Sequence, residues 1–190
     1  TDNSIAHDIG LEKGDVLLTL NGHPVRDVID YMFHSKDDAL EIKVQRGKKM
    51  HTFKTKKKED VPLGIELKSF RTKACRNKCM FCFVNQLPKN MRKTMYLKDD
   101  DYRMSFLFGN YITLTNLSSE EKKRVIEQKL SPLYISVHTT NNDIRRKMLG
   151  NPKAPDILKE LQDLTSNKIR LHVQIVLCPG LNDGKELSNT

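Results

Sequence analysis

The first 57 residues switch between helical and strand-like spacing of their hydrophobic side chains, with turn signals between the segments. The predicted elements are, in order, a helix over 4–9, a strand over 15–20, a helix over 26–34 and two strands over 39–45 and 50–55. The dipeptide Asn21-Gly22 favours a tight turn after the first strand, and residues 46–49 form the turn between the last two. This order predicts a small α+β unit.

A different pattern begins at residue 64, where predicted strands alternate with predicted helices. The strands cover 64–70, part of 105–116, 133–138 and 169–178, and the helices cover 118–130, 142–149 and a stretch that Pro155 opens in its first turn. Ser118 and Glu121 have the spacing of a capping box. Such alternation is typical of βα units in a parallel sheet. Residues 54–60 are polar and highly charged, and we predict a linker over 58–63.

The predicted parallel strands carry polar side chains on one face, although a parallel strand covered on both faces is normally apolar throughout. In one of them, Ile135 and Val137 alternate with Ser136 and His138. If helices cover the apolar faces, the polar faces line an enclosed cavity whose functional end lies at the strand C-termini, as in barrel enzymes. We therefore predict α/β architecture, a partial TIM-type (β/α) barrel. His138, and His172 in a later strand, could each be a hydrogen-bonded side chain that only fills space or could contact a ligand, and the pattern fits both equally.

Charge is concentrated in one stretch of the chain. The 190 residues contain 33 Lys and Arg against 24 Asp and Glu, a net charge of +9, and residues 43–98 alone carry +14. Such a field can steer an acidic electron donor, a flavodoxin or ferredoxin, toward the protein, or it can bind RNA. Aromatic side chains that stack on bases are few here, which makes nucleic acid the weaker partner. A merely solvated surface is the third alternative.

Three of the four cysteines, Cys75, Cys79 and Cys82, lie within eight residues, and Cys178 is far away. Clustering of this kind is typical of a metal or redox site in a reducing compartment rather than of disulfides. No apolar run approaches the roughly 18 residues of a transmembrane helix, and the chain does not open with a signal peptide. We therefore expect no membrane span and a cytoplasmic location.

Three thiolates at the spacing Cys-x3-Cys-x2-Cys suit a cuboidal iron–sulfur cluster in which one iron stays open for a substrate or cofactor. A structural zinc site, with a histidine or Cys178 as fourth ligand, is the alternative. Zinc sites usually take cysteines in Cys-x2-Cys pairs, and only Cys79 and Cys82 have that spacing. Cys178 is better explained as a buried core thiol than as an extra ligand.

This spacing, with the aromatic Phe81 before the last cysteine, resembles the motif of radical SAM enzymes. The resemblance implies a [4Fe-4S] cluster on Cys75, Cys79 and Cys82, whose open iron chelates the amine and carboxylate of S-adenosylmethionine (SAM). It also implies that an electron from the reduced cluster breaks the sulfonium C–S bond and releases a 5′-deoxyadenosyl radical, which abstracts hydrogen from a substrate. Phe81 would lie near the adenine or shield the cluster.

Two later segments, the strands over 134–138 and 173–178, resemble strands that approach SAM in the molybdenum-cofactor branch of that superfamily. The resemblance places four residues on the SAM side: Asn116, Ser136, His138 and Gln174. The chain lacks a clear Gly-Gly-Glu, the usual contact for the SAM amino group. The strand that supplies this contact therefore stays open, and no catalytic residue is assigned.

The first unit resembles a bacterial PDZ domain through its turns at Gly14-Asp15 and Asn21-Gly22. In PDZ domains the loop that captures a peptide carboxylate lies before this point, so we expect the N-terminal strand to be missing and leave peptide binding open. The whole arrangement resembles a bacterial family of PDZ-containing radical SAM or iron–sulfur oxidoreductase-like proteins of unassigned substrate. We therefore expect a PDZ-like domain over 1–57, a linker over 58–63 and a truncated radical SAM partial barrel over 64–190, in a fragment of a longer protein.

Residues 99–101 are three consecutive aspartates. We predict a solvated turn for them, because three adjacent carboxylates cannot all face one site; a cation or amine site is the alternative.

Two functions are compatible with these sequence features. The first is a radical SAM enzyme that acts on an unknown substrate and carries a PDZ-like recognition domain, with a peptide or protein as its ligand. The second is a non-catalytic, zinc-stabilised scaffold that binds peptide or RNA.

Overall fold

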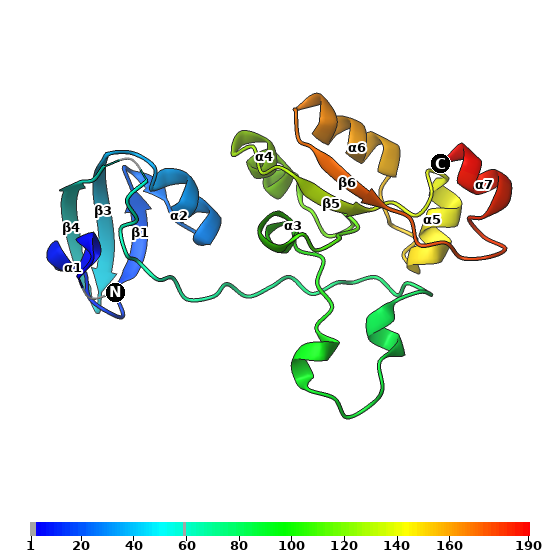
Figure 1. Cartoon of the computed structure of the whole chain (residues 1–190), viewed down its shortest axis with the longest axis horizontal. Helices are drawn as coiled ribbons and strands as arrows, with labels where there is room; N and C mark the ends of the chain where they lie inside the picture. Colours follow the sequence, from blue (N-terminus) through cyan, green and yellow to red (C-terminus); the bar gives the residue numbers. More distant parts are fainter. Residues whose placement is uncertain (1–2, 59) are drawn as a thin grey trace. The chain divides into compact units, whose positions relative to one another are not determined.

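The structure is a computed structural model that describes residues 3–58 and 60–190. It divides the chain into two compact units, Thr1–Arg71 and Thr72–Thr190 (Figure 1). Residues 1, 2 and 59, which belong to the predicted PDZ-like domain and linker, lie outside the described residues.

The first unit is an antiparallel four-stranded sheet, in the order β2-β1-β3-β4, with two short helices. Its elements are α1 (Ile5–Asp8), β1 (Val16–Leu20), β2 (His23–Pro24), α2 (Val28–His34), β3 (Ala39–Arg46) and β4 (Lys49–Lys56). The side chains of Ser4 and Asp27 accept hydrogen bonds from backbone N–H groups in the first turns of α1 and α2, which sets where these helices begin. The two helices and three strands predicted for this part are confirmed, and β2 is a further short strand.

The core of this unit extends past the predicted linker. It consists of Leu20, Leu40, Ile42, Val44 and Leu63. The N–H of Ala6 donates to the carbonyl of Leu63 at 2.9 Å, and Ile65 packs against the same core. The strand predicted over 64–70 is wrong, since these residues form no strand. The stretch belongs to the first unit, where Ile65 packs against the core, and it pairs with no strand.

The second unit is built on a small parallel sheet. Strands β5 (Leu133–Ser136) and β6 (Leu171–Gln174) pair in parallel from end to end. Ile112 forms a parallel bridge with Ile135 on the other edge of β5. Three successive segments thus run in the same direction, but the described residues form no closed barrel. The PDZ-like and partial-barrel assignments stay predictions.

Helices connect and flank these parallel segments. They are α3 (Tyr102–Phe108), α4 (Ser119–Glu127), α5 (Asn142–Leu149), α6 (Ile157–Ser166) and α7 (Gly184–Asn189), with 3-10 turns η1 (Phe83–Gln86) and η2 (Lys93–Tyr96). The capping box of Ser118 and Glu121 is confirmed at the start of α4, and α5 has its predicted bounds. Asp156, rather than Pro155, caps α6. The strand predicted within 105–116 is reduced to the bridge at Ile112, because the stretch begins inside α3.

Helices cover the apolar side chains of the sheet only in part. Leu133 and Ile135 of β5 are fully buried, whereas Val173 of β6, and Ile175 and Leu177 beyond it, are exposed. The predicted cover of apolar strand faces therefore holds for β5 but not for β6. No helix among the described residues has the length and apolar character to cross a membrane.

Candidate metal and cofactor site

The three clustered cysteines lie in a loop, residues 75–82, which we call the cysteine loop. Its beginning is tied to the segment before α3. The N–H of Cys75 donates to the carbonyl of Lys98 at 2.8 Å, and the residues beside them, Ala74 and Asp99, form an antiparallel bridge. The side chain of Lys98 also donates to the carbonyl of Asn77 at 3.3 Å. The loop thus starts from a fixed backbone position.

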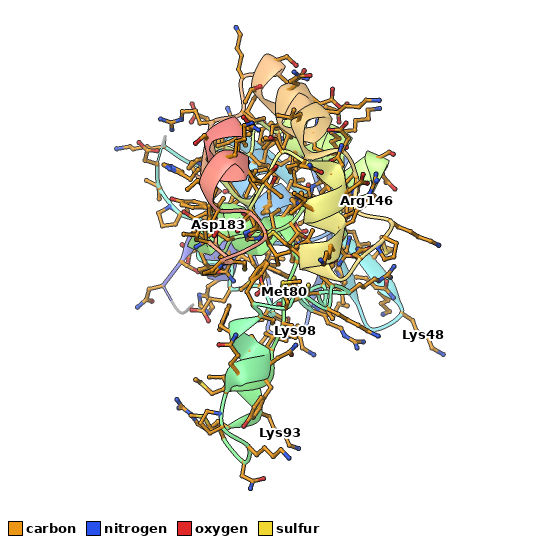
Figure 2. The ribbon with its side chains drawn as sticks, turned by 90° about the vertical axis from the view of Figure 1, so that its right-hand side faces the viewer. Lys48, Met80, Lys93, Lys98, Arg146 and Asp183 are labelled. Carbon is orange, nitrogen blue, oxygen red and sulfur yellow. The ribbon has the colours of Figure 1, made fainter. Side chains whose placement is uncertain are left out.

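The middle of the cysteine loop is tied to the C-terminal end of α5. The N–H of Lys78 donates to the carbonyl of Leu149 at 2.9 Å. The N–H of Met80 donates to the carbonyl of Met148 at 3.1 Å, and Figure 2 shows Met80 beside that end of the helix. Cys79 lies between these two attached residues, so the helix end sets the position of its backbone.

Gly150 makes this attachment sterically feasible. It caps α5 in the left-handed conformation, with φ of 55°. A Cβ atom at this position would lie 2.5 Å from the carbonyl oxygen of Lys78, closer than real Cβ contacts allow. Glycine therefore serves two purposes here, the left-handed backbone and the close approach of the cysteine loop. Neither purpose was recognised in the sequence.

Asn77 connects the inside of the cysteine loop to the segment that follows the Ile112 bridge. Its side chain is buried, and its amide nitrogen donates to the hydroxyls of Thr113 and Thr115 at 2.8 and 3.0 Å. Its amide oxygen accepts from Asn151 at 2.7 Å. A fully hydrogen-bonded buried amide of this kind holds one loop conformation.

The three aspartates beside this network do not form a solvated turn, so that prediction is wrong. Asp100 is buried and accepts from the N–H and the hydroxyl of Thr113 at 2.6 and 2.9 Å. Asp101 is also buried, caps α3 and pairs with Arg103. Asp99 accepts from the side chain of Asn110 at 3.0 Å. The carboxylates point to separate structural partners, which the local sequence could not reveal.

The three clustered thiols are half-buried and close enough to influence one another. Burial, followed by the charges of Cys75 and Cys82, raises the pKa of the Cys79 thiol to about 11. Burial also raises the pKa of Cys75, against a hydrogen bond from the N–H of Asn77. Three thiolates gathered in a partly desolvated loop repel one another, and positive metal charge relieves that repulsion.

This donor set fits an iron–sulfur cluster. Three thiols from one short loop supply the soft, anionic ligands that iron in such clusters takes. The fit is one of donor chemistry and sequence spacing, because within residues 3–58 and 60–190 no group of three or more His, Cys, Asp and Glu side chains has the arrangement of a metal-ion site. Cys178 lies in another segment, the turn before α7, where its backbone N–H donates to the side chain of Asn182 at 2.7 Å.

Phe81 of the cysteine loop lies against His138, which follows β5. Their ring centroids are 4.4 Å apart. His138 is buried, has a φ of 68°, and its Nδ1 accepts from the N–H of Val176 at 3.2 Å. Burial, followed by the positive charge of Arg145, lowers the pKa of the His138 imidazole to about 4. The ring is therefore neutral at pH 7 and carries its proton on Nε2.

The other predicted SAM-side residues also lie at the C-terminal end of the sheet. Ser136 and Gln174 are the last residues of β5 and β6 and are register partners. The N–H of His138 donates to the carbonyl of Gln174 at 3.2 Å. Asn116 lies at the start of the cysteine loop, where its side chain donates to the carbonyl of Ala74 at 3.2 Å. The fold thus brings Phe81, His138, Ser136 and Gln174 to one edge, with Asn116 beside the loop.

His172 lies apart from this edge. Its ring stacks on Tyr134 with centroids 4.6 Å apart, and its side chain is exposed. Of the two histidines that the sequence left undecided, only His138 lies next to the cysteine loop.

Arg145 is a residue of this region that no sequence pattern singled out. It lies in α5 and is fully buried. Its guanidinium donates to the carbonyls of Val137, Thr113 and Ser136, at 3.1, 2.8 and 3.2 Å. These carbonyls belong to the ends of two parallel segments, so Arg145 ties the helix to the edge of the sheet where the predicted site lies.

Comparison with known proteins gives one result. A family model described as a radical SAM-like domain matches residues 57–190, which include the cysteine loop and the whole second unit. No curated protein and no solved structure matches the chain. A match over this share of the sequence shows the family, and the chain belongs to the radical SAM-like domain family.

Proposed function

We propose that this protein is a radical SAM enzyme whose Cys75, Cys79 and Cys82 hold a [4Fe-4S] cluster. The observation that carries the proposal is the placement of three neighbouring, half-buried thiols in a loop with its backbone attached at both its start and its middle. This loop lies inside the stretch that matches the radical SAM-like family. When bound there, the cluster supplies an electron for the reductive cleavage of SAM.

The chain's own residues would orient SAM at the C-terminal edge of the sheet. We assign Ser136, His138 and Gln174 to the SAM side because they are adjacent at that edge. The neutral His138 ring offers a hydrogen-bond donor at Nε2. Phe81 packs on this ring. Asn116 acts through the backbone of Ala74, so its role is to position the loop.

We also propose that an acidic electron donor, a flavodoxin or ferredoxin, docks on residues 83–97, which we call the projecting segment. It directly follows Cys82 and exposes Phe83, Met91, Met95 and Leu97. Lys89, Arg92 and Lys93 add positive charge, and Figure 2 shows Lys93 well away from Met80 and from helix α5. Exposed apolar side chains in a segment that carries only positive charge suit a transient acidic partner. Replacing the three cations with Glu should slow reduction by flavodoxin but not by dithionite; equal rates with flavodoxin would refute this docking site.

For the first unit we propose a PDZ-like role in recognising a peptide or protein. Its support is the antiparallel sheet and the resemblance of its turns, since fold alone does not establish a ligand. Failure of the full chain to bind any member of a random peptide library would count against this role.

The proposed function is tested by metal analysis after anaerobic purification. We expect about four iron and four sulfide per chain and dithionite-dependent formation of 5′-deoxyadenosine from SAM. Cys79→Ser should lose most of the iron, whereas Cys178→Ser, the matched control from another segment, should keep it. Stoichiometric zinc without SAM cleavage would instead support the scaffold function and overturn the proposal.

A further inference from the structure

Arg145 carries a buried positive charge without a matching negative one. The guanidinium is fully buried, and its Nη1 has no hydrogen-bond partner. In contrast to Arg146, which pairs with Asp143 at 3.3 Å, Arg145 forms no ion pair with any residue that the structure describes. Uncompensated buried charge is costly, and most proteins avoid it. Backbone carbonyls accept hydrogen bonds from its Nε and Nη2 atoms, but because carbonyls are neutral they do not compensate the positive charge.

Among the acidic groups, Asp100 has the largest electrostatic effect on Arg145, but it forms no ion pair with it and has other hydrogen-bond partners. Its carboxylate accepts from the N–H and hydroxyl of Thr113 and from the hydroxyl of Thr115. Burial raises the pKa of Asp100, and its hydrogen bonds from Thr113 and Thr115 oppose that shift.

Arg145 is electrostatically coupled to the cysteine loop. Burial lowers the pKa of its guanidinium to about 10, and the charges of Asp100, Cys79 and Glu160 oppose that shift. The same helix attaches the loop, since the carbonyls of Met148 and Leu149 accept from the residues on either side of Cys79. Helix α5 therefore carries the buried cation and is hydrogen-bonded to the backbone on both sides of Cys79.

We propose that Arg145 is the buried counter-charge of the cluster held by Cys75, Cys79 and Cys82, and that it raises the reduction potential of that cluster. This inference rests on the proposed function. One-electron reduction, by dithionite or by a flavodoxin, adds one negative charge to the cluster and its three thiolates. A positive charge held in a low-dielectric interior stabilises the reduced state more than the oxidised one. Arg145 is thus a positioning residue that acts through the cluster, not a group that touches substrate.

The test is a redox titration of the reconstituted full chain, monitored by the EPR signal of the reduced cluster. Arg145→Met removes the charge, and Arg145→Lys keeps it while losing the guanidinium fork. Arg146→Met removes a neighbouring, partly exposed cation and serves as the control. We expect a lower midpoint potential in Arg145→Met, a potential near wild type in Arg145→Lys, and no change in Arg146→Met.

Structural damage is separated from the charge effect by iron content and circular dichroism of each variant. If Arg145→Met does not fold, Arg145→Gln replaces it, because its amide can still donate to a carbonyl at the sheet edge. A neutral variant with the wild-type potential overturns the inference, and so does an equal shift in the Lys and the neutral variants. A wild-type chain that binds no iron refutes the proposed function instead, so the two failures are distinguishable.

Discussion

Substitution of Gly150 by alanine tests whether the end of α5 sets the position of the cysteine loop. The new Cβ atom would lie 2.5 Å from the carbonyl oxygen of Lys78 and 3.0 Å from its carbonyl carbon. Both are backbone atoms that cannot rotate away, so the loop must move. That movement breaks the hydrogen bonds from Lys78 to Leu149 and from Met80 to Met148.

The magnitude follows from these two effects. Alanine in a left-handed conformation costs roughly 1–2 kcal/mol, and two lost backbone hydrogen bonds cost roughly 1 kcal/mol each. Gly150→Ala should therefore lower the free energy of unfolding by about 3–4 kcal/mol. Gly184 offers a matched control, because its φ of 52° is close to the 55° of Gly150 but no atom lies within 4 Å of the position that a Cβ would take there. Gly184→Ala should cost only the strain, roughly 1–2 kcal/mol.

The assay is thermal unfolding of both variants, together with iron content after anaerobic reconstitution. A difference of about 2 kcal/mol corresponds to a gap of roughly 6–8 °C in Tm for a unit of this size. Gly150→Ala should also retain less iron than Gly184→Ala, since Cys79 moves with the loop. Equal melting temperatures and equal iron contents in the two variants would refute the argument that this close approach sets the site.

Two further predictions concern the same region. Asn77→Ala leaves the hydroxyls of the buried Thr113 and the half-buried Thr115 without their amide partner. Urea denaturation should therefore show a loss of about 3 kcal/mol in the free energy of unfolding, whereas replacement of the exposed Asn85 by alanine should change little; similar losses in both would contradict the role of Asn77. The lowered pKa of His138, about 4, means that the unfolded chain binds more protons than the folded one between pH 4 and its ordinary pKa of 6.5. Stability should therefore fall by about 2 kcal/mol from pH 7 to pH 5, and His138→Gln should reduce that fall while His172→Gln keeps it; an unchanged pH dependence in His138→Gln would show that the ring is not held neutral.

Local signals in the sequence predicted much of the secondary structure. The capping box of Ser118 and Glu121, the bounds of α5 and the hairpin of β3 and β4 depend on residues only a few positions apart. The same holds for the cysteine loop, whose cysteine spacing is a property of eight consecutive residues. Short-range chemistry of this kind is readable without knowledge of the fold.

The predictions of a strand over 64–70 and of a solvated turn over 99–101 were wrong because both features depend on contacts with residues far away in the sequence. Whether an alternating stretch becomes a strand depends on a free strand edge beside it, and residues 64–70 stay with the first unit, where Ile65 packs against the core. Whether an aspartate is solvated depends on which donors meet it, and Asp100 is met by Thr113, 13 positions away.

The sequence by itself determined the three thiols, their spacing and the polar residues at the strand ends. Only the tertiary structure decided how they are supported. Asn77 forms hydrogen bonds with Thr113 and Asn151, and the absence of a side chain at Gly150 allows the carbonyl of Lys78 to approach closely. The charge of Arg145, which has no ion-pair partner among the described residues, interacts electrostatically with Cys79. These relations link segments tens of residues apart, and no local periodicity encodes them. Burial then determines their strength, because low dielectric makes an unpaired charge or hydrogen-bonding group matter far more than it does in water.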